Sequence, residues 1–118
     1  MQSGGEKTIL RISAYIPTQR YYFFGEYFDP TGIIVTVHYS DGTSDTVQFS
    51  DYAGIKWWLP NNPNDPNPTM SNSSYRAFIA GDKNIVITYS VDGKTYETVS
   101  TVGVGSRPDD GNPNVIMP

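Results

Sequence analysis

The chain has 118 residues, enough for one domain with a core of its own, and its lack of cysteine excludes disulfides and thiolate metal sites. Eight basic and twelve acidic side chains give a formal net charge of −4, and the basic ones form no stripe, so no nucleic-acid partner is expected. No stretch approaches the roughly 20 consecutive apolar residues of a membrane-spanning helix, so no membrane insertion is expected.

Strand-forming residues dominate the ordered-looking segments, whereas strong helix formers are scarce and never fall at helical spacing. This predicts an all-β domain. A first strand is expected over 8–14, where Leu10 and Ile12 share one face and Ile9 lies on the other, which leaves the buried face open. A second extended segment is expected over 20–24.

A clean two-residue alternation begins at Ile33 and predicts a hairpin over 33–49. A two-residue Asp-Gly loop would place the apolar residues of the two strands on opposite faces. A three-residue loop with Gly42 in the left-handed region, as a G1 bulge, pairs Val35 with Val47 and keeps the apolar residues together. The bulged hairpin is therefore predicted.

A second hairpin is expected over 84–104, turning around an Asp-Gly pair. Its register stays open. A bulge at the glycine pairs Ile85 with Val99, whereas a two-residue turn pairs Tyr89 with Tyr96.

Between the hairpins, residues 50–76 show no periodicity and contain several prolines, which predicts a long Asn/Pro-rich loop. Long loops in compact domains are often functional or mobile. The expected organisation is a flexible N-terminal arm over 1–7, a β-sandwich over 8–104, and a Pro/Gly/Asn-rich C-terminal arm or linker over 105–118.

Two segments carry a family resemblance. Residues 22–43 read Tyr-x-x-Gly-Glu-x-Phe-Asp-x-x-Gly-Ile-x-Val-Thr-Val-x-Tyr-Ser-Asp-Gly-Thr, and residues 80–89 read Ala-Gly-Asp-Lys-Asn-Ile-Val-Ile-Thr-Tyr. In both, the chain resembles the group 3 bacterial immunoglobulin-like domains. The resemblance covers most of 15–104 and departs over 50–75. It implies an immunoglobulin-like β-sandwich of about seven strands, with extended termini and no catalytic residues.

Domains of this family are accessory or spacer modules in surface and secreted proteins of mainly Gram-positive bacteria, and similar modules decorate phage heads and tails. The resemblance therefore implies a non-catalytic structural or adhesion module with protein partners in a capsid, tail or surface assembly, and with a cell-surface glycan as a second kind of partner. The polar N-terminus lacks a secretory signal, which favours a virion component, a head-decoration or tail-associated protein. The alternative is a spacer or glycan-binding accessory module at the bacterial cell surface or in a secreted protein.

Candidate catalytic groups are few. His38 is the only histidine, the nearest hydroxyls in sequence are Ser40 and Ser44, and most aspartates sit in or beside turn-like segments. On the face opposite the apolar residues of its strand, His38 is expected to be an ordinary surface or inter-strand residue. No enzyme activity is expected.

Hard oxygen ligands for calcium occur in two short spans, namely Asn62, Asn64, Asp65 and Asn67 in the loop and Asp109 and Asp110 in the tail. Interspersed prolines and the lack of a bidentate glutamate favour a solvated turn. No metal and no cofactor is expected.

Two pairs of neighbouring aromatic residues are the candidate ligand- or partner-binding residues: Tyr21 with Tyr22, and Trp57 with Trp58. Since adjacent residues cannot all face inward, one ring of each pair is expected to point outward. An exposed indole beside an Asn-rich loop can stack on a sugar ring or anchor a protein interface. The competing interpretation is that Trp57 or Trp58 plugs one end of the sandwich.

Overall fold

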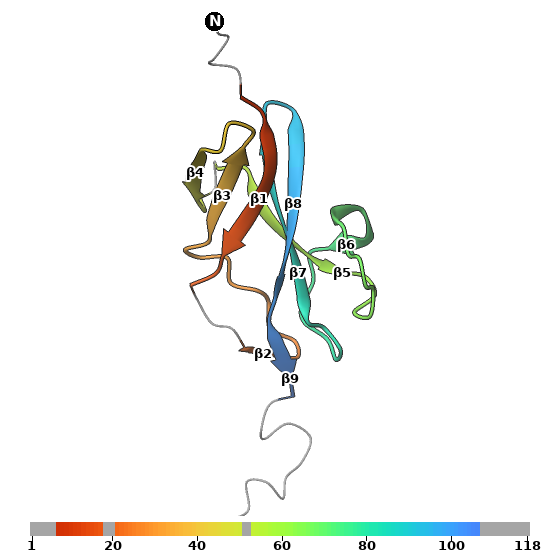
Figure 1. Ribbon diagram of the computed structural model, residues 1–118. Helices are drawn as coiled ribbons and strands as arrows, with labels where there is room; N and C mark the ends of the chain where they lie inside the picture. Colours follow the sequence, from red (N-terminus) through yellow and green to blue (C-terminus); the bar gives the residue numbers. More distant parts are fainter. Residues whose placement is uncertain (1–6, 18–20, 51–52, 107–118) are drawn as a thin grey trace, which may run out of the picture.

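A computed structural model (Figure 1) describes residues 7–17, 21–50 and 53–106, and over these residues the chain is all-β, as predicted. They form nine strands, rather than about seven, and one short 3-10 helix, η1 (Met70–Asn72). None of the helices in this part of the chain has the length and apolar character needed to cross a membrane.

The nine strands lie in three sheets. The first is antiparallel and contains, in spatial order, β1 (Ile9–Tyr15), β3 (Ile34–Tyr39) and β4 (Ser44–Gln48). The second is also antiparallel and contains, in spatial order, β6 (Ser73–Ser74), β5 (Ile55–Pro60), β7 (Asn84–Val91) and β8 (Lys94–Thr101). The third is a short parallel pair, β2 (Tyr21–Phe23) with β9 (Gly103–Gly105).

A single apolar core joins the two larger sheets, an arrangement compatible with a β-sandwich. Its buried residues come from both sheets and from the segments that link them: Ile12, Ile16, Tyr22, Phe28, Ile33, Val35, Val37, Ile55, Leu59, Phe78, Ile85 and Ile87. Apolar burial of this kind is the main favourable term in folding.

The first hairpin, β3–β4, has the predicted bulged register. Val35 pairs with Val47, and the Phe49 amide donates to the Ile33 carbonyl oxygen at 2.9 Å. Gly42 has φ +89° and its amide donates to the Tyr39 carbonyl oxygen at 3.1 Å, which closes the three-residue loop.

A bulge in β1 explains why its sequence left the buried face open. The pairing with β3 shifts by one residue between Ile9 and Arg11, so that Leu10 is the extra residue. As a result Ile9 and Ile12 both contact the core, while Leu10 is 66% exposed.

The second hairpin, β7–β8, has the two-residue turn, with Tyr89 opposite Tyr96. Asp92 has φ +52° and Gly93 has φ +78°, the positive values that a type I′ turn requires at both central positions. The bulged alternative, which pairs Ile85 with Val99, does not occur: Ile85 lies opposite Ser100.

The prediction of one long loop over 50–76 is wrong. This segment contains β5, which pairs with β7 along four residues, and also β6 and η1. Ile55, Trp57 and Leu59 point toward the core. This alternation is not recognisable as a strand from the sequence because it includes only three apolar residues and is followed by prolines. The Asn/Pro stretch itself is confined to 61–72, here termed the Asn/Pro loop.

The chain runs from one end of the domain to the other. In Figure 1, β1 begins at the upper end and β9 ends at the lower end. β8 leads into β9 with a break at Val102, and thereby carries the chain from the large sheet to the β2–β9 pair. The start of β1 and the end of β9 therefore lie at opposite poles.

Gly54 should be the glycine least tolerant of substitution. It has φ +79°, and an added Cβ would lie 2.5 Å from the Ser90 carbonyl oxygen on β7. Gly42 has a similar φ of +89° with nothing within 4 Å, so it is the matched control. We expect Gly42→Ala to cost about 1–2 kcal/mol from backbone strain and Gly54→Ala about 1–3 kcal/mol more. Urea denaturation of the two variants measures this, and equal losses would contradict the close approach.

Candidate functional site

The site is built on the outer face of β7, a strand that is buried on both faces. Ile85 and Ile87 face the core, whereas Val86 and Thr88 point to the opposite side of the sheet and are 0% and 1% exposed. Trp58 pairs with Val86 and so shares this outer face, and its indole N–H donates to Thr88 Oγ1 at 3.2 Å. The outer face therefore carries an apolar layer that needs a cover of its own.

The Asn/Pro loop lies over this outer face. It leaves the end of β5, packs η1 against β5 and β7, and returns as β6 alongside β5 (Figure 1). The Met70 amide donates to Glu97 Oε1 on β8 at 3.3 Å, and the Asn61 amide donates to the Asn72 carbonyl oxygen at 2.8 Å. The loop is thus tied to three strands and to itself.

Inside the loop, two of the four residues considered as calcium ligands, Asn62 and Asp65, accept hydrogen bonds through their side-chain oxygens. Asn62 Oδ1 accepts from the Asn64 amide at 3.0 Å, and Asp65 Oδ1 accepts from the Asn67 amide at 2.9 Å. Asp65 Oδ2 accepts from the Asn72 side-chain amide at 2.7 Å. Over the described ranges no group of three or more acidic, His or Cys side chains gathers, and Asp109 and Asp110 lie outside them. These side chains hold the loop in shape.

Three aromatic rings, Trp57, Trp58 and Tyr75, form what we term the aromatic surface. Tyr75 stacks on Trp58 with ring centroids 4.4 Å apart at 25°, and its ring meets Trp57 edge-on at 5.2 Å. Trp57 in turn packs edge-on against Phe28 of the core at 5.6 Å. Both tryptophans are half-buried, while Tyr75 is 50% exposed and its partial burial raises its pKa. The ring that faces solvent is therefore a tyrosine that the sequence did not single out.

The neighbouring tyrosines Tyr21 and Tyr22 lie away from the aromatic surface. As expected, one ring points inward and the other outward. Tyr22 is 1% exposed and contacts Phe78 and Phe28 at 4.7 and 5.9 Å between ring centroids, so it belongs to the core. Tyr21 is 52% exposed, on β2 beside Gly105. The four predicted site residues do not converge on one surface.

An ion pair fixes the chain directly after Tyr75. Both guanidinium nitrogens of Arg76 donate to the Asp82 carboxylate, at 2.7 and 2.8 Å, and the Asp82 side chain is fully buried. Arg76 also donates to the carbonyl oxygens of Pro60 and Ala77, and Asp82 accepts from the Ile79 amide. The pair thereby joins the end of β5 to the 76–82 segment and sets where Tyr75 can lie.

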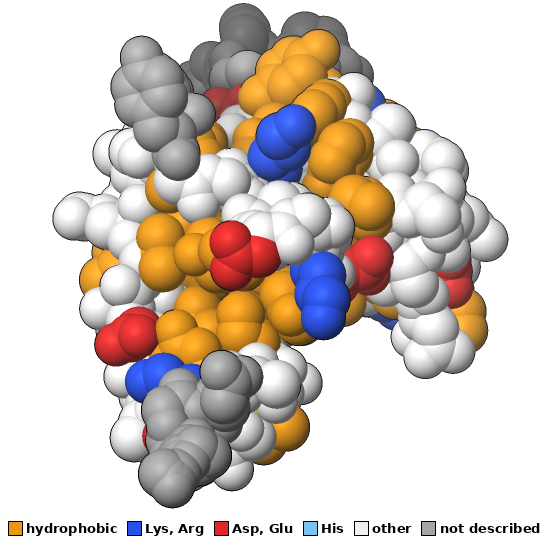
Figure 2. All heavy atoms as spheres, turned by 90° about the horizontal axis from the view of Figure 1, so that it is seen from above, with side chains coloured by type: hydrophobic (Ala, Val, Ile, Leu, Met, Phe, Trp, Pro, Cys, Tyr) orange, Lys and Arg blue, Asp and Glu red, His pale blue; other side chains and the backbone are white. Residues whose placement is uncertain are grey.

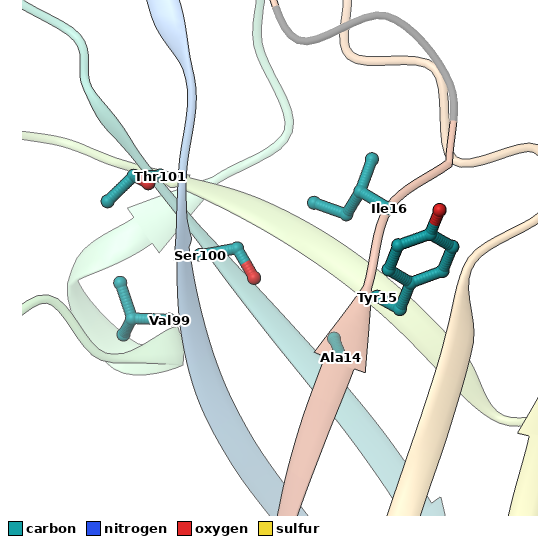
Figure 3. A pocket seen from close by; sticks show the side chains of 6 residues that line it. All are labelled: Ala14, Tyr15, Ile16, Val99, Ser100 and Thr101. Carbon is teal, nitrogen blue, oxygen red and sulfur yellow. The ribbon is translucent and has the colours of Figure 1, made fainter.

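His38 lines neither of two hollows in the described surface. Its Nε2 lies 3.0 Å from Ser13 Oγ on the outer face of the β1–β3–β4 sheet. The larger hollow, about 340 Å³, lies between β1 and β8, where Ile16 and Ser100 point toward each other (Figure 3). Its other lining residues are Ala14, Tyr15, Val99 and Thr101, all uncharged. The smaller hollow, about 180 Å³, lies between the start of β1 and the β7–β8 turn.

Charge is spread thinly over the molecule. On the face seen in Figure 2, hydrophobic side chains form a band in which acidic and basic side chains stand singly. The aromatic surface offers one half-exposed tyrosine ring stacked on an indole. Comparisons with protein-family models, with curated proteins and with solved structures found no match.

Asp82→Asn should destabilise the domain and loosen the aromatic surface. It leaves the Arg76 guanidinium, four-fifths buried, without its counter-charge, which should cost about 3 kcal/mol. Asp45→Asn is the control, because exposed Asp45 also accepts a side-chain hydrogen bond, from Tyr39, and should lose less than about 1 kcal/mol. Chemical denaturation followed by tryptophan emission reports both effects. Equal losses would show that the ion pair does not fix this region.

Proposed function

We propose that the chain is a non-catalytic immunoglobulin-like module with a structural and adhesive role, held between different neighbours at its two poles. The observation that carries this proposal is the lengthwise path of the chain, from the start of β1 at one pole to the end of β9 at the other (Figure 1). The family resemblance of 22–43 and 80–89 supports the immunoglobulin-like assignment. The placement of His38, which lines neither of these two hollows, supports a role without catalysis.

The strand pairing at the lower pole suits a module that transmits force. β2 and β9 run parallel, and the Phe24 amide donates to the Gly105 carbonyl oxygen at 3.0 Å. When the two poles are pulled apart, β2 and β9 are pulled in opposite directions along their length. The hydrogen bonds between them are then loaded together rather than one after another, which raises the force they withstand.

Two settings fit such a module, and we favour a phage virion, as a head-decoration or tail-associated component with capsid or tail proteins as neighbours. A fold that needs no disulfide suits assembly in a reducing cytoplasm. The second setting is a bacterial cell-surface or secreted protein, in which the module acts as a spacer or a glycan-binding accessory domain.

The force-bearing role can be tested with a matched pair of proline variants. Phe24→Pro removes the amide that donates to the Gly105 carbonyl oxygen. Phe49→Pro removes the amide that follows the edge strand β4 and donates to the Ile33 carbonyl oxygen. Both residues are half-buried phenylalanines, but only the Phe24 amide bonds to the end of β9, on the proposed path of load. Single-molecule stretching from the two termini should show a lower unfolding force for Phe24→Pro than for Phe49→Pro. Equal forces in the two variants would contradict the proposed path of load.

The setting can be tested by fractionation. If the chain is a virion component, mass spectrometry of gradient-purified particles from its source should detect it with capsid or tail proteins, at a stoichiometry that survives a high-salt wash. Recovery only from the cell-wall or secreted fraction would overturn the virion setting and favour the bacterial surface.

A further inference from the structure

We infer that the exposed face of Tyr75 binds one face of a pyranose ring in a β-1,4-linked glycan. The inference deepens the adhesive role proposed above, and rests on it, by naming the surface and the class of ligand. In a β-1,4-linked chain of glucose or N-acetylglucosamine every ring substituent is equatorial, so each ring presents a flat face of axial C–H groups. Such a face complements the negative face of an aromatic ring.

The ring that would receive the sugar is held in place before a ligand arrives. Trp58 covers one face of Tyr75, and Trp58 is itself fixed by the strand pairing with Val86 and by its hydrogen bond to Thr88. Trp57 contacts the Tyr75 ring from a nearly perpendicular plane, at 80°. Because half of the tyrosine remains exposed with one face covered, the opposite face is the one that solvent reaches. Little conformational freedom is left to lose on binding.

Neutral hydrogen-bonding groups occur in the segments joined to Tyr75. Ser74, the residue before Tyr75, donates its hydroxyl to Asn61 Oδ1 at 2.9 Å, which ties the exposed Asn61 side chain to the segment that carries the ring. Asn62 follows, exposed and held by the Asx turn of the loop. Amides and hydroxyls in fixed positions suit sugar hydroxyl groups, which both donate and accept.

The electrostatics favour a neutral ligand. Arg76, the residue after Tyr75, has its charge matched by Asp82 through two short hydrogen bonds. Lys56 and Glu97 are exposed, of opposite sign, and Glu97 accepts from the Met70 amide. With the nearby charges balanced, the surface has little to attract an anionic or a cationic partner.

The size of the exposed apolar area favours a sugar over a protein. Of the three rings of the aromatic surface, only Tyr75 is exposed. A stable protein interface buries about 1,000 Å² or more around several apolar anchors. One ring face matches one pyranose, and the fixed loop beside it can contact the next residue of the glycan.

The test titrates the full chain with cellohexaose and with N-acetylchitohexaose and follows tryptophan emission, since Trp58 lies directly behind Tyr75, with calorimetry as a second measure. Wild type should bind at least one of the two, and the stronger response identifies a glucan or an amino-sugar polymer. Tyr75→Ala should raise Kd about tenfold or more. Tyr75→Phe keeps the ring and should bind nearly as well as wild type. Tyr15→Ala, which removes a tyrosine of similar exposure from the other sheet, should leave Kd unchanged.

Three results would overturn the inference. If wild type responds to neither oligosaccharide, glycan binding is contradicted and a protein partner is the alternative ligand for the aromatic surface. A Tyr15→Ala loss equal to that of Tyr75→Ala places binding elsewhere. Unchanged binding by Tyr75→Ala does the same. If Tyr75→Ala fails to fold by circular dichroism, amide shifts of wild type during the titration decide instead, and they should cluster around 57–62 and 73–76. None of these outcomes affects the stretching experiment, so a failure of glycan binding can be distinguished from a failure of the force-bearing role.

Discussion

The structure depends on one constraint, which is that β7 is buried on both faces. Residues 85–88 on β7 are apolar or nearly so and are buried. The three-stranded sheet packs against only one face of the four-stranded sheet that contains β7, so it covers only one side of these residues. The other side, with Val86 and Thr88, would lie open to water without a second layer. The Asn/Pro loop supplies that layer together with Trp58, so a polar segment without periodicity completes a core.

The Asn/Pro loop has few apolar side chains, so its conformation is held by polar contacts and not by apolar packing. Asx turns at Asn62 and Asp65 shape the loop, and the Arg76–Asp82 pair fixes the segment that follows it. Buried ion pairs add little net stability compared with apolar residues, but they specify one geometry because the alternatives leave a charge unmatched. Tyr75 lies between these two fixed segments, which explains why a half-exposed ring is held so firmly.

Sequence reasoning worked where side-chain alternation was long and uninterrupted. It found the bulge at Gly42, because only that register gathers the apolar residues of both strands on one face. It missed β5, where the alternation includes only three apolar residues. It left the buried face of β1 undecided, because the bulge at Leu10 changes which residues face the core within the strand. Tyr75 gave no local signal, since its place is set by Trp58 and by an ion pair formed with a residue six positions beyond Arg76.

The two proposed roles use different parts of the molecule. The proposed path of load runs through β1, β2 and β9 along the length of the domain. The rings of the aromatic surface belong to β5 and to the residue after β6, two strands that lie at the side of the domain (Figure 1). Tension along the first path reaches the large sheet at its β8 edge, since β8 leads into β9, whereas Tyr75 follows β6 at the opposite edge, beyond β7 and β5. A module arranged in this way can hold its neighbours apart and keep a rigid ring presented sideways while it is under strain.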